Sequence, residues 1–120
     1  MLFVCYAGCS TCRKAEAFLR SAGVGFEVRD IKGENPTGEE LLRWREISGL
    51  PLKKFFNTSG QSYRALGLRD KPSALPEEEQ LRLLASDGML VKRPILVGEG
   101  FVLVGFREEQ WAEKLGENTR

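Results

Sequence analysis

Apolar and polar residues follow two different rhythms along the first part of this 120-residue chain. Residues 2–6 form a short apolar run typical of a buried strand, and residues 24–31 alternate like a strand, with Phe26 and Val28 on its apolar side. Between these runs, apolar residues recur at the spacing of a helix: Ala15, Phe18, Leu19 and Ala22. The pattern predicts strand, helix and parallel strand, because a crossover of this length joins parallel neighbours.

Residues 33–90 carry helical patterns only. Thr37 followed by Glu40 has the spacing of a capping box and predicts the start of a helix. A loop is expected at residues 71–76, where Pro76 followed by three glutamates predicts a second helix start. We therefore expect an inserted helical lobe without strands.

Strand patterns return near the C-terminal end. The runs 95–97 and 101–104 flank a Gly-Glu-Gly turn and predict an antiparallel hairpin. A helix is expected to follow from Arg107 to Leu115.

This order of elements predicts an α/β fold in a single domain over residues 1–120. Residues 1–32 and 91–120 would build one mixed four-stranded sheet, with residues 33–90 inserted as the lobe. A Cys-X-X-Cys motif directly after the first strand is typical of a thioredoxin-like fold.

Composition narrows the class of protein. Apolar residues make up 42% and charged residues 29% of the chain, as in a soluble globular domain. The net charge of +1 gives no electrostatic reason to expect direct binding to nucleic acid or to a membrane. No apolar run approaches a membrane span and no secretory signal pattern stands out, so we expect a cytoplasmic protein. The absence of histidine excludes Cys–His and Ser–His catalytic arrangements.

The candidate chemistry lies at Cys9 and Cys12, which the pattern places at the first turn of a helix. Unpaired backbone N–H groups and the helix dipole favour a thiolate there, and Arg13 adds a cation. Helix N-termini, cations and Cys-X-X-Cys spacing all lower a thiol pKa from its free value of about 8.5. The spacing lets one thiolate attack a disulfide or an oxidised centre while the other resolves the intermediate.

Two other interpretations stay open for this pair. A structural zinc site needs four Cys or His ligands, whereas the chain has three cysteines and no histidine, so carboxylates or a second copy would have to complete it. The two residues would otherwise be ordinary cysteines at a helix start. The third cysteine, Cys5, lies within the first predicted strand and is expected in the core as a small apolar residue.

A second candidate segment is Arg93-Pro94, directly before the predicted strand 95–97. If the bond is cis, it would hold the backbone near the Cys9 loop, and Arg93 would stabilise the thiolate and bind an anion through its forked guanidinium. Otherwise Pro94 is a trans proline at a strand entry beside a solvated arginine. Lys92 is expected at the surface.

These segments resemble a known family. Residues 9–15, residues 93–95 before a late strand, and the helical lobe between them are similar to the glutaredoxin-dependent arsenate reductase (ArsC) and Spx/MgsR family. Residues 48–60 and 84–90 are similar to its arsenate-reductase-like branch. The resemblance covers nearly the whole chain and implies the thioredoxin-like fold.

The resemblance also implies residue roles. Cys9 takes the position of the nucleophilic cysteine and Cys12 that of the second redox cysteine of Spx. Arg93 matches an arginine that contacts the oxyanion or the thiolate, and Pro94 matches a cis-proline. Arg107 lies about one residue from the position of a last arginine in arsenate reductases.

The chain departs from that pattern in the lobe. Asn57 and Thr58 stand where arsenate reductases carry a further arginine. An oxyanion site without that guanidinium loses a charge-assisted contact. The sequence therefore leaves the substrate open.

Two functional hypotheses of different classes follow. The first is an enzyme, a thiol–disulfide or oxyanion oxidoreductase that uses the Cys9–Cys12 pair with Arg93 and Arg13 tuning the thiolate. It has no bound cofactor and no metal. The resemblance implies glutathione as a co-substrate and glutaredoxin or thioredoxin as reducing partners.

The second hypothesis is a redox-sensing, Spx-like transcriptional regulator that binds the C-terminal domain of the RNA polymerase α-subunit. The Cys9–Cys12 disulfide would be its switch. Gly49 lies in about the region of such a contact, although a helix end is its simplest explanation. A family member that only binds partners is a third outcome.

Overall fold

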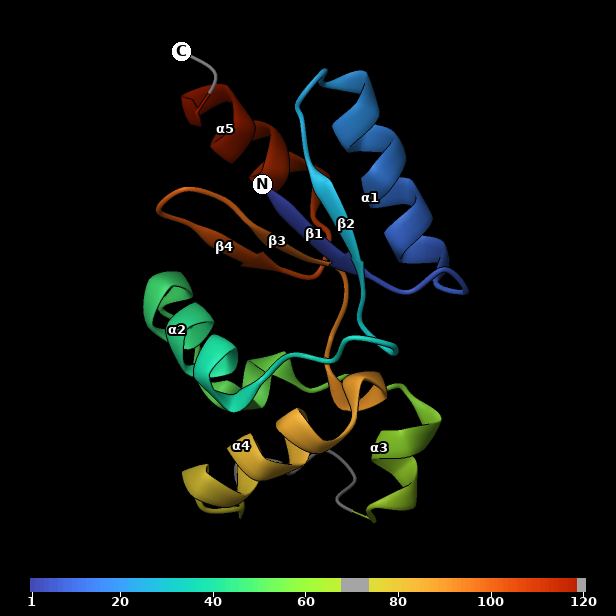
Figure 1. Ribbon diagram of the computed structural model, residues 1–120, viewed down its shortest axis with the longest axis vertical. Coiled ribbons are helices and arrows are strands. Elements are labelled where there is room, and N and C mark those ends of the chain that lie inside the picture. The colour runs from blue at the N-terminus through green and yellow to red at the C-terminus, as the bar shows by residue number, and fades with distance from the viewer. Residues whose placement is uncertain (68–73, 119–120) are drawn as a thin grey trace.

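The computed structural model describes residues 1–67 and 74–118 of the chain (Figure 1). The strands are β1 (Leu2–Cys5), β2 (Glu27–Asp30), β3 (Ile95–Val97) and β4 (Val102–Val104). The α-helices are α1 (Ser10–Ser21), α2 (Gly38–Ser48), α3 (Gln61–Ala65), α4 (Glu77–Ser86) and α5 (Glu108–Asn118), and the 3-10 turns are η1 (Leu52–Phe55) and η3 (Gly88–Leu90). The start of the expected loop, around Lys71 and Pro72, lies outside the described residues.

The four strands form one mixed sheet in the order β2-β1-β3-β4. β1 pairs in parallel with β2 and antiparallel with β3, and β3 and β4 form the antiparallel hairpin. The expected α/β fold with a mixed four-stranded sheet is confirmed. The central position of β1 matters for function, because the Cys9 loop leaves directly from its end.

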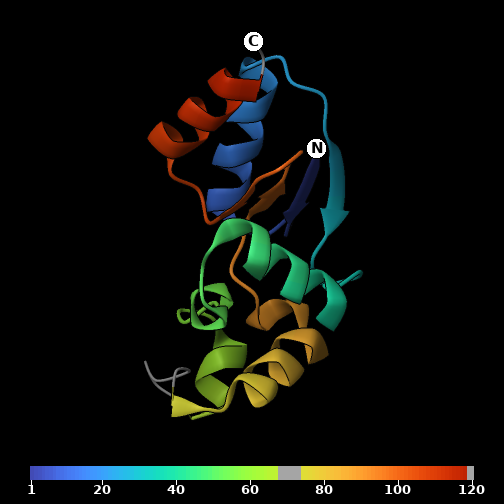
Figure 2. The ribbon, with the colours of Figure 1, turned by 90° about the vertical axis from the view of Figure 1, so that its left-hand side faces the viewer.

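One face of the sheet is covered by α1 and α5, which Figure 2 shows on the same side of the strands. Their buried apolar residues form one cluster with the sheet: Phe3, Cys5, Cys12, Ala15, Leu19, Leu96, Phe101, Leu103, Trp111 and Leu115. Cys5 is 8% exposed, so its expected place in the core is confirmed. This packing fixes the N-terminal end of α1 against the end of β1.

The helices of residues 38–90 gather beyond the end of the sheet and reach its other face (Figures 1 and 2). Their core includes Leu41, Trp44, Phe55, Tyr63, Leu84 and Val91, together with Val4, Ile31, Ile95 and Val102 of the sheet side. In the described part of residues 33–90 there is no strand, as expected. A single bridge between Phe56 and Val91 ties η1 to the segment that enters β3.

Local helix signals in the sequence are confirmed. The side chain of Thr37 accepts the N–H of Glu40, and Glu40 accepts the N–H of Thr37, which completes the capping box of α2. Gly49 ends that helix with a φ of 73°, a left-handed conformation that glycine adopts without a steric penalty.

One strand differs from its prediction. β2 covers only residues 27–30, and Val28 is 55% exposed although the alternating pattern placed it on the buried face. β2 stands at the edge of the sheet, where it pairs with β1 alone and the helices do not cover the Val28 side chain. An alternating pattern indicates which residues share one face of a strand, but it does not indicate whether other elements pack on that face.

Candidate functional site

Cys9 is the N-cap residue of α1. Its backbone N–H donates to Tyr6 O at 3.0 Å, which closes the tight turn after β1. Its sulfur accepts the backbone N–H of Cys12 at 3.4 Å. The sulfur therefore sits at the positive end of a 12-residue helix and takes up one of its unpaired N–H groups.

Cys12 lies one turn further into α1 and is 2% exposed. Its sulfur accepts the backbone N–H of Tyr6 at 3.4 Å. Burial raises the pKa of the Cys12 thiol to about 12, and this thiol also donates to the Cys9 sulfur. At neutral pH, Cys12 is therefore the protonated member of the pair.

The pKa of Cys9 moves the other way. Partial burial alone would raise it, but the backbone and thiol hydrogen bonds from Cys12, together with the hydrogen bond and charge of Arg93, lower it below its ordinary value. The pKa values of the two thiols thus shift in opposite directions, because Cys9 has hydrogen-bond donors and a cation beside it whereas Cys12 is buried. Of the two, Cys9 is the cysteine whose surroundings favour the thiolate.

Arg93 is held beside this turn by contacts on two sides. Its guanidinium carbon lies 5.2 Å from the centroid of the Tyr6 ring, and Nη1 donates to Met89 O at 3.4 Å. The Arg93–Pro94 peptide bond is cis. Pro94 O accepts the N–H of Gly105 at 2.8 Å, which joins this segment to the end of β4.

Cys9 opens onto a cavity of about 450 Å³ between the sheet and the lobe. Its lining comes from four separate stretches of the chain: Cys9, Thr11, Asn57, Ser59, Gly60, Lys92, Arg93, Val104, Gly105, Phe106 and Arg107. Three of these residues are basic, and within the described part of the chain no acidic side chain lines the cavity. The site joins the Cys9 sulfur to a positively charged hollow.

Some of the predicted site residues lie at the cavity and others do not. Cys9, Arg93 and Arg107 line this cavity, and Cys12 contacts Cys9 from within the helix. Arg13 is exposed on α1 and does not line the cavity. The cation that acts on Cys9 is therefore Arg93, which lies 84 positions further along the sequence.

Lys92, Asn57 and Ser59 are cavity residues that sequence reasoning did not assign to the site. Lys92 is exposed, as expected, and its exposed side chain lines the cavity. The adjacent basic pair Lys92-Arg93 was a signal available in the sequence. Asn57 stands at the position where the resemblance expects a site arginine, which was a signal for that position. No motif marks Ser59, and the docking of the lobe brings both residues to the cavity.

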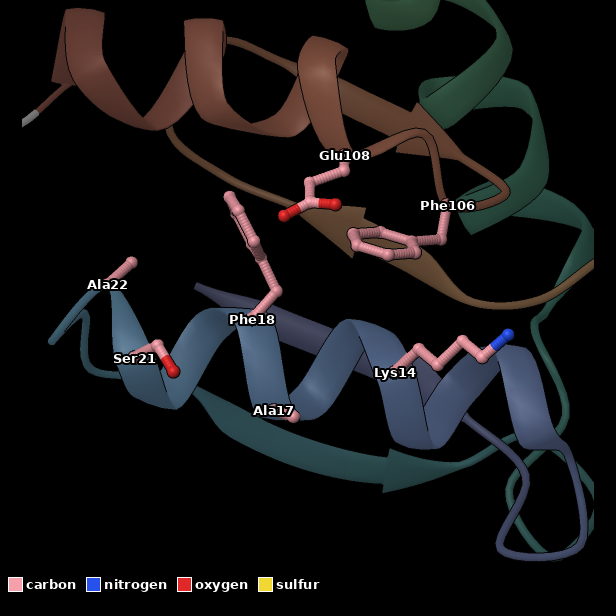
Figure 3. Close-up of a pocket in the computed structure, with 7 residues that line it drawn as sticks. All are labelled: Lys14, Ala17, Phe18, Ser21, Ala22, Phe106 and Glu108. Atoms are coloured by element: carbon pink, nitrogen blue, oxygen red, sulfur yellow. The ribbon is translucent and has the colours of Figure 1, made fainter.

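A second hollow, of about 590 Å³, lies between α1 and the start of α5 (Figure 3). The rings of Phe18 and Phe106 face each other across it, with centroids 5.7 Å apart. It contains no thiol among its described lining residues, and its charged groups are Lys14 and Glu108. Phe106 lines both hollows, and Cys9 lines only the first.

Within residues 1–67 and 74–118, no group of three or more Cys, Asp or Glu side chains is arranged to hold a metal ion. Over the same residues, no helix has the length and apolar character needed to cross a membrane.

Comparison with known proteins places these features in a wider group. Residues 5–114 match the model of the ArsC family. The chain is 49% identical to YusI of Bacillus subtilis, an uncharacterized protein, over 94% of this chain and 96% of that one. It is 28% identical to the regulatory protein MgsR of the same organism, over 88% and 82% of the two chains.

Solved structures agree with this grouping. A Bacteroides fragilis protein described as related to the ArsC family superposes with a TM-score of 0.89 at 52% identity, covering 93% of this chain and 94% of that one. An arsenate reductase from Vibrio cholerae superposes with a TM-score of 0.79 at 28% identity, covering 94% and 97%. The same arrangement of sheet and helices recurs in both.

Proposed function

The chain belongs to the ArsC family, and we propose that it is a thiol-dependent reductase of disulfides or oxyanions in which Cys9 is the nucleophile and Cys12 the resolving thiol. The observation that carries the proposal is the placement of two cysteines in hydrogen-bond contact, in surroundings that shift their pKa values in opposite directions. Arg93 and the donors of Cys12 lower the pKa of Cys9, and Cys12 is a buried thiol that donates to the Cys9 sulfur. Similarity to an arsenate reductase supports the same class of chemistry.

With a disulfide substrate, the Cys9 thiolate attacks one sulfur. A bond forms between Cys9 Sγ and that sulfur, the substrate S–S bond breaks, and its electron pair leaves with the second sulfur, which takes a proton from water. Arg93 holds Cys9 in its reactive form before the attack, and the basic cavity accommodates a negatively charged leaving group.

Resolution falls to Cys12. Once Cys9 is bound in the mixed disulfide it no longer carries a negative charge, so its contribution to the high pKa of Cys12 disappears. Cys12 gives its proton to water and attacks Cys9 Sγ. The bond between Cys9 Sγ and the substrate sulfur breaks, and the remaining substrate thiolate leaves with the electron pair. The substrate gains two electrons, the pair becomes a Cys9–Cys12 disulfide, and an external thiol reductant such as glutathione, glutaredoxin or thioredoxin restores the dithiol.

An oxyanion follows the same electron path. Cys9 replaces one oxygen on the central atom, which leaves as water after protonation. Attack of Cys12 on Cys9 Sγ then breaks the bond to the central atom, whose oxidation state falls by two. Arsenate is the test substrate for this route.

The decisive experiment adds a disulfide or arsenate to the reduced protein and follows the covalent state of each cysteine by mass spectrometry. Wild type is expected to form the Cys9–Cys12 disulfide. Cys12→Ser should stop at a covalent adduct on Cys9, which is a mixed disulfide with the disulfide reagent and a sulfur–arsenic bond with arsenate. Cys9→Ser should not react, and Cys5→Ala, in the core, is the matched control. A wild-type protein that reacts no faster than free cysteine with either reagent would rule out the proposal.

A second candidate function rests on a different observation. MgsR, which is named as a regulatory protein, aligns with 88% of this chain. On this hypothesis the Cys9–Cys12 disulfide switches binding to the RNA polymerase α-subunit. The test is retention of purified α-subunit by the reduced and the oxidised protein, with Cys12→Ser as the form that cannot switch. Equal, background-level retention in all three states rejects it.

A further inference from the structure

Lys92 has a defined course along the cavity wall. A Cβ atom placed on Gly105 would come within 3.0 Å of Lys92 Cε and 3.8 Å of Nζ. The aliphatic part of the Lys92 side chain therefore lies over the bare backbone of Gly105, whose φ of 79° also favours glycine. The absence of a side chain at Gly105 gives the lysine its path.

Both ends of this contact are anchored. The backbone N–H of Lys92 donates to Phe55 O at 2.7 Å. Gly105 donates to Pro94 O at 2.8 Å, and Gly105 O accepts the buried indole N–H of Trp111 at 3.1 Å. The wall under Lys92 is thus tied to the sheet and to α5, so the backbone on both sides of this contact is held in place.

The charge around the cavity is not balanced by the protein. Lys92, Arg93 and Arg107 all line it, and in the described residues no carboxylate pairs with any of them. Cations gathered at one hollow raise the local concentration of anions and favour a negatively charged ligand there. The cavity of about 450 Å³ is also within the size range of small-molecule sites, roughly 300–1,000 Å³.

Lys92 and Arg93 have separable roles. Arg93 acts on the Cys9 sulfur, while Lys92 is not among the groups that shift the Cys9 pKa. We propose that Lys92, guided by Gly105, binds a carboxylate or oxyanion group of the molecule that reacts with Cys9, and so makes the site selective for anionic substrates. This inference deepens the proposed function and rests on Cys9 being the reacting group.

A test that needs no turnover compares two alkylating reagents of similar size, iodoacetate and neutral iodoacetamide. In each reaction the Cys9 thiolate forms a bond to carbon and iodide leaves with the electron pair. The ratio of the two rates measures anion preference at the sulfur, independent of how much thiolate is present. Lys92→Gln should lower the iodoacetate-to-iodoacetamide ratio by about two- to fivefold, the range expected for a partly exposed charge pair.

Matched variants make the result specific. Lys92→Arg should keep the wild-type ratio, and Lys53→Gln, which changes an exposed lysine in η1, should not move it. Gly105→Ala should lower the ratio, since the new Cβ displaces Lys92 Cε. An unchanged ratio in Lys92→Gln would overturn the assignment.

Steady-state reduction gives the second readout. Lys92→Gln should raise the KM for a disulfide that carries carboxylates, and leave that for bis(2-hydroxyethyl) disulfide unchanged. Equal effects on both disulfides would overturn the assignment while the proposed function stands. A wild type that reduces neither disulfide nor arsenate, yet shows the Lys92-dependent alkylation ratio, would reject the proposed function and keep the anion site.

Discussion

Arg29 on β2 and Glu40 in the first turn of α2 form a two-point ion pair, with Nη1–Oε2 and Nη2–Oε1 distances of 2.6 and 2.9 Å. Arg29 also donates to the backbone oxygens of Glu34 and Asn35. Both partners are mostly buried, with side-chain exposures of 16% and 25%. The pair joins the sheet edge to the lobe that carries one wall of the cavity.

We predict that Glu40→Gln lowers the free energy of unfolding by about 1 to 3 kcal/mol at neutral pH. Glutamine preserves the capping box, so the loss isolates the ion pair. The hydrogen bond from Arg29 lowers the pKa of Glu40 from 4.5 to about 2, so its stabilisation is complete above pH 4.5 and is lost as the pH falls towards 2. Urea unfolding of both proteins across that range should give converging stabilities at low pH, with exposed Glu39→Gln as the control.

The thiolate of Cys9 should depend on Arg93. Arg93→Gln removes a hydrogen bond and a positive charge that favour the ionised sulfur, so we expect the Cys9 pKa to rise. Ultraviolet absorbance of the thiolate against pH measures it directly. Arg13→Gln is the matched control, because Arg13 lies outside the cavity, and a larger shift in Arg13→Gln than in Arg93→Gln would contradict the assignment.

Cys12 should influence the same titration through its proton. Cys12→Ala removes the thiol that donates to Cys9, whereas Cys12→Ser keeps a hydroxyl donor in the same place. We expect the Cys9 pKa to rise more in the alanine variant than in the serine variant. No rise in either variant would show that the backbone N–H of Cys12, which both variants keep, is the effective donor.

Gly88 should be intolerant of any side chain. A Cβ atom there would overlap the backbone oxygen and carbon of Ile31, at the contact where η3 meets the end of β2. Gly88→Ala is therefore predicted to lower the free energy of unfolding by about 1 to 3 kcal/mol, as overpacked sites do. Gly25→Ala meets no atom within 4 Å and is the control for replacing a glycine, measured by the same denaturant titration.

Much of the fold follows from local patterns. The apolar run before Cys9, the helical spacing after Cys12 and the Gly-Glu-Gly turn each have a short-range physical cause, and the sheet they predict is confirmed. The predicted burial of Val28 is wrong, because the burial of a side chain on an edge strand depends on packing neighbours that are distant in sequence. Pattern alone cannot supply that information.

The site shows the same division. Cys9 and Cys12 are visible because their spacing carries chemistry, and Arg93 because it precedes a strand-entry proline. Asn57 and Lys92 reach the cavity through lobe contacts, including the hydrogen bonds from Asn57 N–H to Leu90 O and from Lys92 N–H to Phe55 O, both 2.7 Å. Such pairings link segments more than 30 residues apart and leave no local signature.

The cavity walls come from four stretches of chain that meet only in the native state. In an unfolded chain, Cys9 has neither the helix terminus nor Arg93 beside it and is an ordinary thiol. Its alkylation rate is therefore an internal gauge of folding. The fraction of protein with a fast-reacting Cys9 should equal the folded fraction, so unfolding can be followed without adding a dye.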